Sequence, residues 1–110
     1  MRKNAHILIL LATQYINKNC SKKISIAALV KHTGYSVRSI QLNFSKHFGV
    51  TQTEYIKEVR MLRVFALIKK NKLNRTIAEM AKESGFTHAG RFSVDFKKRF
   101  GITPKDHARN

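Results

Sequence analysis

Two long polar side chains, Arg38 and Gln41, lie three residues apart in a segment that begins at Ser36. On a helix, residues at this spacing share one face. A guanidinium can bind O6 and N7 of guanine with two hydrogen bonds, and a carboxamide can bind N6 and N7 of adenine. Val37 and Leu42 beside them offer only apolar contact, for instance to the methyl group of thymine. This set suits the reading of base edges; the alternative is that Arg38 is a solvated or phosphate-bound charge.

These side chains need a helix that holds them at a surface. The sequence predicts a short helix over residues 26–32, a turn centred on Gly34, and a second helix over 37–47 that Gly49 ends. A short helix, a turn with a central glycine and a following helix form the helix-turn-helix pattern, in which glycine permits a backbone conformation closed to residues with a Cβ. In such proteins the beginning of the second helix faces the bases.

The same pattern returns later in the chain. A short helix is predicted over 76–82, a turn over 84–86, and a following helix over 88–99 that Gly101 stops. Gly34 and Gly85 are separated by 51 positions (85 − 34 = 51), whereas Phe44 and Phe96 are separated by 52 (96 − 44 = 52). One structural unit therefore occurs twice, with one residue inserted early in the second following helix.

The second copy offers a poorer set of reading side chains. Only three residues at its reading positions are polar. We therefore expect the first copy to read the sequence stringently and the second to dock tolerantly, largely through phosphates. Gly90 also costs a helix roughly 1 kcal/mol relative to alanine, which fits either close approach of DNA or relaxed selection. The equivalent reading positions are His88, Ala89, Gly90, Arg91, Ser93 and Val94.

A run without glycine or proline, Thr53–Lys70, separates the two copies. It predicts one helix of roughly 27 Å at about 1.5 Å per residue, which suits a rigid spacer because one turn of B-DNA is about 34 Å. Its apolar residues, Leu62 among them, occur on two sides, so we expect one copy to pack on each. The sequence thus predicts an all-α protein with a lobe over 1–52, a linking helix over 53–72 and a lobe over 73–110.

Helix boundaries can be assigned from caps and apolar spacing. A first helix should end near residues 17–20 and cover a core with one face. The residues of that face are Ile7, Leu8, Leu11, Tyr15 and Ile16. The expected N-caps of the later helices are Ser25, Ser36, Thr53 and Thr87. Arg2, Lys3 and residues 105–110 are expected to be frayed ends.

The composition favours a polyanionic partner. Lys and Arg total 22 against 6 acidic residues, a formal net charge of +16 in 110 residues. Such self-repulsion points to nucleic acid, and a membrane is disfavoured because the basic residues are spread along the chain. The single cysteine fits a reducing cytoplasm. Phosphate contacts are expected from Ser36, Ser45, Lys46, Thr87, Lys97 and Lys98.

Catalytic and metal-binding patterns are absent from the sequence. The five histidines are scattered and there is one cysteine, so no zinc ligand set is evident. Glu79 and Glu83 lie four residues apart, but their neighbours indicate helix solvation rather than a metal-dependent nuclease. We therefore expect no enzyme activity, no metal and no cofactor.

Nearly the whole chain resembles the DNA-binding domain of AraC/XylS-type bacterial transcription regulators. The residues that carry the resemblance are Gly34-Tyr35-Ser36, Ile40…Phe44…Phe48-Gly49, Tyr55-Ile56, Arg60-Met61…Ala66-Leu67-Ile68, Ile77-Ala78…Ala81…Ser84-Gly85-Phe86 and Phe92…Phe96…Phe100-Gly101-Ile102-Thr103-Pro104. Members of that family often carry a long polar or basic residue where this chain has Leu42.

The resemblance implies two homeodomain-like lobes that bind successive major-groove segments of double-stranded DNA as a monomer. It further implies a transcription regulator, most simply an activator that works with RNA polymerase, located in the bacterial cytoplasm and on the nucleoid when bound to DNA. No small-molecule effector is expected, because the chain has no room for a sensing domain. The alternatives are a non-specific architectural or RNA-binding protein, a protein-interaction module, or the excised domain of a larger ligand-responsive regulator.

Overall fold

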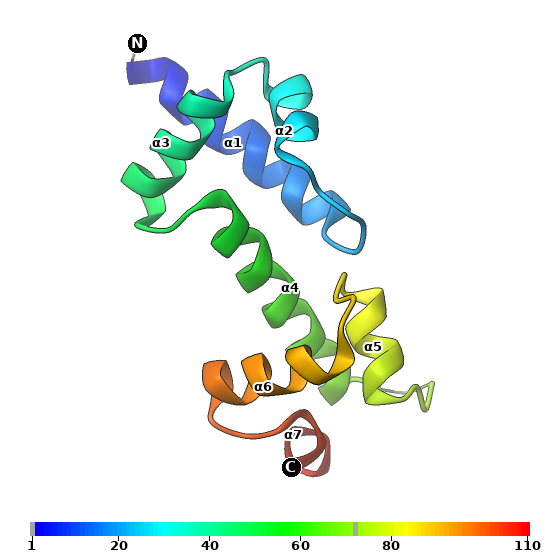
Figure 1. Ribbon diagram of the computed structural model, residues 1–110. Coiled ribbons are helices and arrows are strands. Elements are labelled where there is room, and N and C mark those ends of the chain that lie inside the picture. The colour runs from blue at the N-terminus through cyan, green and yellow to red at the C-terminus, as the bar shows by residue number, and fades with distance from the viewer. Residues whose placement is uncertain (1, 72) are drawn as a thin grey trace. The chain divides into compact units, whose positions relative to one another are not determined.

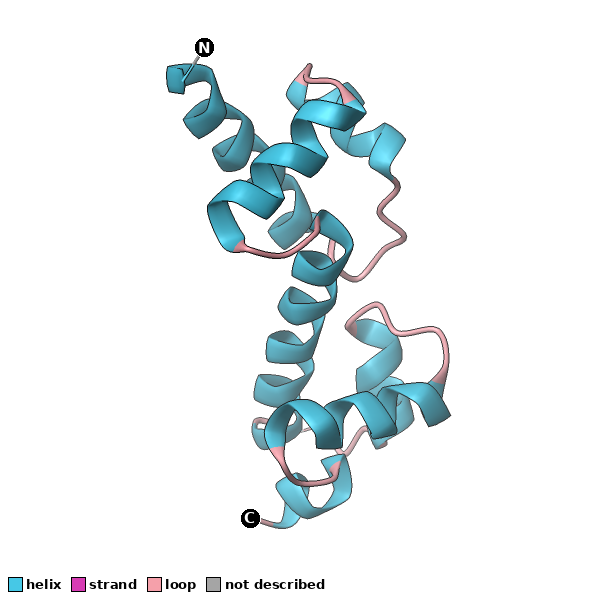
Figure 2. Cartoon of the chain, turned by 60° about the vertical axis from the view of Figure 1, so that its left-hand side comes forward, coloured by secondary structure: helices cyan, strands magenta, loops and turns pink. Residues whose placement is uncertain are grey.

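All regular secondary structure in the described part of the chain is helical. The computed structural model describes residues 2–71 and 73–110, with side chains from residue 6 onward, and these residues form seven helices and no strand (Figures 1 and 2). The all-α prediction is confirmed. The chain divides into two compact units, one ending at Val59 and the other beginning at Arg60.

The first unit packs four helical segments around one core. Its helices are α1 (Arg2–Asn19), α2 (Ile26–Thr33), α3 (Val37–Phe48) and the beginning of α4 (Gln52–Lys69). The buried core residues are Leu8, Ala12, Ile16, Leu29, Ile40, Phe44 and Ile56. On α1 the buried side chains repeat every four residues, so Ile7, expected on the core face, is instead 50% exposed.

Serine caps hold the first helix pair as predicted. The Ser25 hydroxyl accepts a hydrogen bond from the Ala28 amide at 3.0 Å, and Ser36 accepts one from the Ser39 amide at 3.1 Å. Between the two helices Gly34 adopts a φ of 78°, a left-handed conformation that glycine takes without a Cβ clash. The predicted helix-turn-helix of the first unit is therefore present.

Helix α4 begins earlier than expected, at Gln52. Thr51 is its N-cap: the Thr51 hydroxyl accepts from the Glu54 amide at 3.1 Å, and a Glu54 carboxylate oxygen accepts from the Thr51 amide at 2.9 Å. The expectation that Thr53 caps this helix is wrong, because the reciprocal bonds require a threonine three residues before the glutamate.

The second unit has its own aromatic core. It contains the rest of α4, then α5 (Ile77–Glu83), α6 (Ala89–Phe100) and α7 (Pro104–Arg109). The buried residues are Met61, Val64, Ile68, Met80, Ala81, Phe92 and Phe96. Leu62, expected among the packing residues of α4, is 50% exposed and belongs to neither core, which corrects that prediction.

The C-terminal residues form a helix that is anchored to the second core. Thr103 caps α7 by accepting from the Asp106 amide at 3.1 Å, and Pro104 occupies the first helical turn. His107 is 3% exposed. The prediction that residues 105–110 are frayed is wrong, because a capping threonine followed by proline begins a helix. Arg2 and Lys3, also expected to be frayed, lie within α1.

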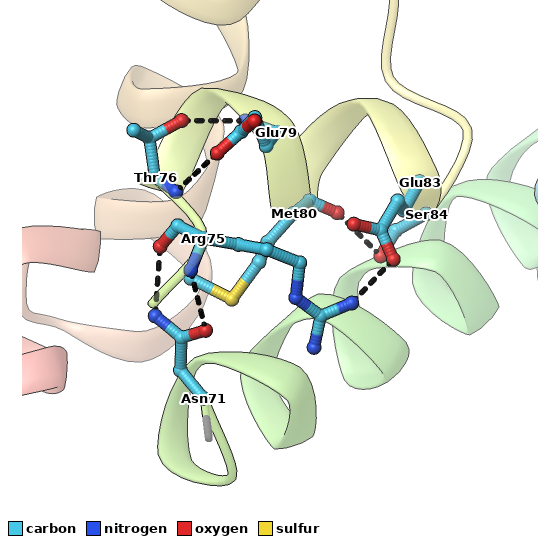
Figure 3. Close-up of polar contacts among 7 residues, drawn as sticks. All are labelled: Asn71, Arg75, Thr76, Glu79, Met80, Glu83 and Ser84. Carbon is cyan, nitrogen blue, oxygen red and sulfur yellow. Dashed lines mark hydrogen bonds and ion pairs between the residues drawn. The ribbon is translucent and has the colours of Figure 1, made fainter. Parts of the chain in front are cut away.

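The connection between α4 and α5 is fixed by side-chain bonds to the backbone (Figure 3). The side-chain nitrogen Nδ2 of Asn71 donates to the backbone carbonyl oxygen of Arg75 at 2.7 Å. The side-chain oxygen Oδ1 of Asn71 accepts from the backbone amide of Arg75 at 3.0 Å. Thr76 and Glu79 form a capping box at the start of α5, and the Arg75 guanidinium pairs with Glu83 near its end. Both glutamates thus hold α5 in place.

Candidate nucleic-acid interface

Helix α3 presents the predicted reading side chains on one exposed surface. Ile40 and Phe44 are fully buried and fix the rotation of the helix. The four predicted base-reading residues, Val37, Arg38, Gln41 and Leu42, are all exposed. At about 100° per residue they span roughly 140° of the helix circumference. The first unit therefore brings together two side chains suited to bidentate hydrogen bonds and two apolar ones.

Ser39 lies at the flank of this surface, as its position predicts. Its hydroxyl lies 3.1 Å from that of Ser36, and its carbonyl oxygen accepts from the Asn43 side-chain amide at 2.7 Å. These bonds engage Ser39 locally, so the long side chains of Arg38 and Gln41 remain the polar groups that extend from the helix.

Helix α6, the second following helix, begins without a side-chain cap. His88 is its N-cap residue, with φ −125° and ψ 102°, and makes no capping hydrogen bond. The expectation that Thr87 caps this helix is wrong. Ser36 and His88 hold equivalent N-cap positions and are 52 residues apart (88 − 36 = 52).

That spacing also corrects the place of the inserted residue. The buried Phe44 and Phe96 are separated by the same 52 positions as the two N-caps (96 − 44 = 52). The extra residue therefore lies in the turn after Gly85 and before α6 begins. A turn can absorb one residue, whereas inside a helix it would rotate the buried face by about 100°.

The corrected register pairs each reading position of α3 with a residue of α6. Gly90 occupies the position of Arg38, and Arg91 occupies that of the flanking Ser39. The Arg91 side chain is 73% exposed and its Nε lies 3.5 Å from a carboxylate oxygen of Asp95, one turn further along the helix. The sequence did not show this register, because Thr87 is the usual type of N-cap residue and His88, the actual N-cap, is not.

The remaining reading positions of α6 carry small side chains. Ser93 holds the place of Gln41, and Val94, which is 50% exposed, that of Leu42. His88 and Ala89 are exposed at the helix start. A Cβ added to Gly90 would meet no atom within 4 Å, so the fold does not require glycine there. The second unit presents no long polar side chain at the two positions where the first presents Arg38 and Gln41.

All of the predicted phosphate-binding residues are exposed, and two pairs of them, Ser45 with Lys97 and Lys46 with Lys98, occupy equivalent places in the two units. Those residues are Ser36, Ser45, Lys46, Thr87, Lys97 and Lys98. Lys46 and Lys98 lie in the last turns of α3 and α6 and correspond in register. A lysine there is favourable to its own helix dipole, and its ammonium remains able to meet a phosphate.

The described residues form neither a metal site nor a membrane-spanning helix. Over 2–71 and 73–110, no three His, Cys, Asp or Glu side chains gather as a metal site would require. Nor does any helix in this part of the chain combine the length and apolar character needed to cross a bilayer. The exposed surfaces of α3 and α6 are the candidate site.

Comparison with known proteins also identifies helix-turn-helix motifs in this chain. A family model described as a helix-turn-helix domain matches residues 29–110. The chain is 34% identical over 97 residues to the XylDLEGF operon transcriptional activator 1 of Pseudomonas putida, covering 87% of this chain and 29% of that protein. It is 36% identical over 95 residues to the F1 operon positive regulatory protein of Yersinia pestis, covering 86% of this chain and 31% of that protein.

A solved structure matches nearly the whole chain. The fold is similar, with a TM-score of 0.85, to the crystal structure of a probable AraC family transcriptional regulator from Rhodopseudomonas palustris CGA009. The two are 26% identical, and the match covers 93% of this chain and 94% of that one.

Proposed function

Because this chain belongs to the AraC/XylS family of helix-turn-helix regulators, we propose that it binds double-stranded DNA sequence-specifically and regulates transcription in a bacterium. Helices α3 and α6 enter successive major-groove segments. The contacts to bases come from the exposed residues Val37, Arg38, Gln41 and Leu42 of α3 and Ala89, Gly90, Ser93 and Val94 of α6, with His88 and Arg91 at the flank of the second set. The contacts to phosphates come from Ser36, Ser45, Lys46, Thr87, Lys97 and Lys98. The protein has no enzymatic role in this proposal.

One observation carries the proposal. In the first unit, buried Ile40 and Phe44 fix the rotation of α3 so that Arg38 and Gln41 extend from its first two turns. These are the side-chain types that bind guanine and adenine with two hydrogen bonds. The net charge of +16 adds a sequence-independent attraction to the phosphates.

A single copy of the chain is sufficient for a two-part DNA site. Each unit carries its own core and its own recognition helix, and α4 runs without interruption from Gln52 to Lys69 between them. The two recognition helices are covalently joined in one chain, so both can engage one duplex without a second copy. We therefore propose that the protein binds as a monomer.

Regulation is proposed to be positive. Two relatives are named as a transcriptional activator and a positive regulatory protein, and we propose RNA polymerase as the protein partner. The protein acts where bacterial DNA lies, in the cytoplasm. This chain spans only 29% and 31% of the length of those relatives.

Selection from a pool of random duplexes at two salt concentrations tests the proposal. We expect enrichment of a bipartite motif whose halves are centred about 10 base pairs apart. The slope of log affinity against log salt should report about 0.9 per phosphate contact. If no motif is enriched and all duplexes bind equally, the protein is a non-specific, charge-driven binder. If the protein binds no duplex at either salt concentration, it is a protein-interaction module instead, for which Arg38 and Gln41 are dispensable.

A further inference from the structure

An apolar side chain points directly away from the core at the same place on both recognition helices. Leu42 of α3 is 57% exposed, and Val94 of α6 is 50% exposed. Each lies two residues from both of the buried anchors of its own helix. At about 100° per residue, that places it roughly 160–200° around the helix axis from those anchors. Neither side chain can contribute to its core.

The recurrence calls for a common cause. Leu42 and Val94 are separated by 52 residues (94 − 42 = 52), the spacing of the two N-caps. A single exposed aliphatic residue needs no explanation. Here, however, two separate cores present one at the same outward position, while the polar neighbours differ: Gln41 precedes Leu42, and Ser93 precedes Val94. The two helices thus share an apolar contact point but not a hydrogen-bonding pattern.

We propose that Leu42 and Val94 each read the C5-methyl group of one thymine, one in each half of the DNA site. This inference rests on the proposed function. In the major groove the thymine methyl is the apolar group among hydrogen-bonding base edges. Contact between a branched aliphatic side chain and that methyl group removes apolar surface from water and so favours binding. The two half-sites therefore differ at the bases that Arg38 and Gln41 bind but share one preferred thymine.

Replacement of thymine by uracil isolates the methyl group, because the base pair is otherwise unchanged. The selected duplex is resynthesised with deoxyuridine at each thymine of the two half-sites in turn, and Kd is measured at fixed salt. We expect one position in each half-site at which the substitution weakens binding by roughly fourfold, the value of one buried methyl group. Other thymines should tolerate it.

Variants assign each methyl to its side chain. Leu42→Ala should make uracil and thymine equivalent in one half-site only, and Val94→Ala should do so in the other only. Leu10→Ala is the matched control, since Leu10 is a leucine of α1 that is 55% exposed, close to the 57% of Leu42. It should leave both thymine preferences intact. All three side chains are exposed, so thermal unfolding should be little changed.

The outcomes separate this inference from the function on which it rests. Sequence-specific binding that is insensitive to uracil at every position would overturn the methyl reading while leaving the proposed function intact. So would selected half-sites without a preferred thymine, or a thymine preference that persists in Leu42→Ala. The absence of any enriched sequence would overturn the proposed function itself, and the inference with it.

Discussion

The imidazole of His107 stacks on the ring of Phe65, with ring centroids 3.9 Å apart and planes inclined by 25°. Its Nε2 lies 3.0 Å from the Phe65 carbonyl oxygen, so Nε2 is the donor, since a carbonyl oxygen only accepts. The two residues are 42 positions apart in the sequence. This contact attaches α7 to α4 beside the ring of Phe96, and it makes the C-terminal helix part of the core that supports α6.

Removal of the His107 ring should destabilise the second unit. His107→Ala leaves a cavity beside Phe65 and loses the hydrogen bond to the carbonyl oxygen, so we expect a loss of about 2–3 kcal/mol in the free energy of unfolding. His107→Phe keeps a stacked ring and should cost about 1 kcal/mol. Urea unfolding measures both, with the exposed Arg109→Ala as control. Equal stability of His107→Ala and the parent would show that α7 does not support the core.

The same charged substitution should unfold the second unit at one residue of α4 and be tolerated at the next. Met61 is 2% exposed in the second core, whereas Leu62 is 50% exposed. Met61→Asp buries an unpaired carboxylate and should unfold the second unit, with a cost of at least about 3 kcal/mol. Leu62→Asp should change stability by less than about 0.5 kcal/mol. Circular dichroism during thermal unfolding distinguishes the two, and a Leu62→Asp protein that fails to fold would contradict the structure.

Acid should weaken the start of α5 through Glu79. The backbone amide and then the hydroxyl of Thr76 hydrogen-bond this carboxylate and lower its pKa. A carboxyl whose pKa is lower in the folded state stabilises the fold above its unfolded-state pKa, and this stability is lost as the pH falls through the folded-state pKa. Stability should therefore decline in the acid range below the usual pKa of a glutamate. Glu79→Gln should show a smaller decline over that range, and an identical decline would contradict this role.

Base reading and phosphate binding should separate in two variants. Arg38→Ala should cost about 1–3 kcal/mol against the selected duplex and relax the preference at one base pair. Lys98→Ala should weaken binding to all duplexes similarly and reduce the salt slope by about one contact. Titration of selected and scrambled duplexes measures both. If Arg38→Ala weakens the two duplexes equally, its guanidinium binds phosphate rather than a base.

A reading side chain can be added to the second unit. Gly90 holds the position of Arg38 and has open space around it, so Gly90→Arg should create a preference for guanine at one base pair of the second half-site. Gly90→Ala is the control: it should raise helix stability by roughly 0.5–1 kcal/mol without a new base preference. Repeating the duplex selection with Gly90→Arg tests the register, which would be wrong if the selected motif were unchanged.

Local signals in the sequence were sufficient for most of the fold. Ser25, Ser36 and Gly34 act as predicted because a cap or a left-handed turn is a property of a few neighbouring residues. The start of α4 could have been placed correctly from the same rules, since Thr51 and Glu54 have the spacing of a capping box. Thr103 followed by Pro104 likewise has the pattern that begins a helix, although residues 105–110 were predicted to be frayed.

Other features depended on contacts between distant residues. Periodicity placed Ile7 and Leu62 on apolar faces of their helices, but each apolar face is wider than the surface that the core covers. Packing decided that Leu8 is buried where its neighbour Ile7 is exposed, and that Met61 is buried where Leu62 is exposed. His107 was one of five scattered histidines in the sequence. Its contact with Phe65 exists only because α7 folds back onto α4.

The sequence alone determined that one helix-turn-helix unit occurs twice, that each has a recognition helix, and that the chain carries the charge to bind DNA, because these follow from composition and from spacing along the chain. The tertiary structure decided which side chains of α3 and α6 face outward, and in which register. Buried Phe44 and Phe96 fix the rotation of their helices. A register shift of one residue would turn all side chains of the helix by about 100° around its axis. That rotation places Gly90 where the first unit has Arg38.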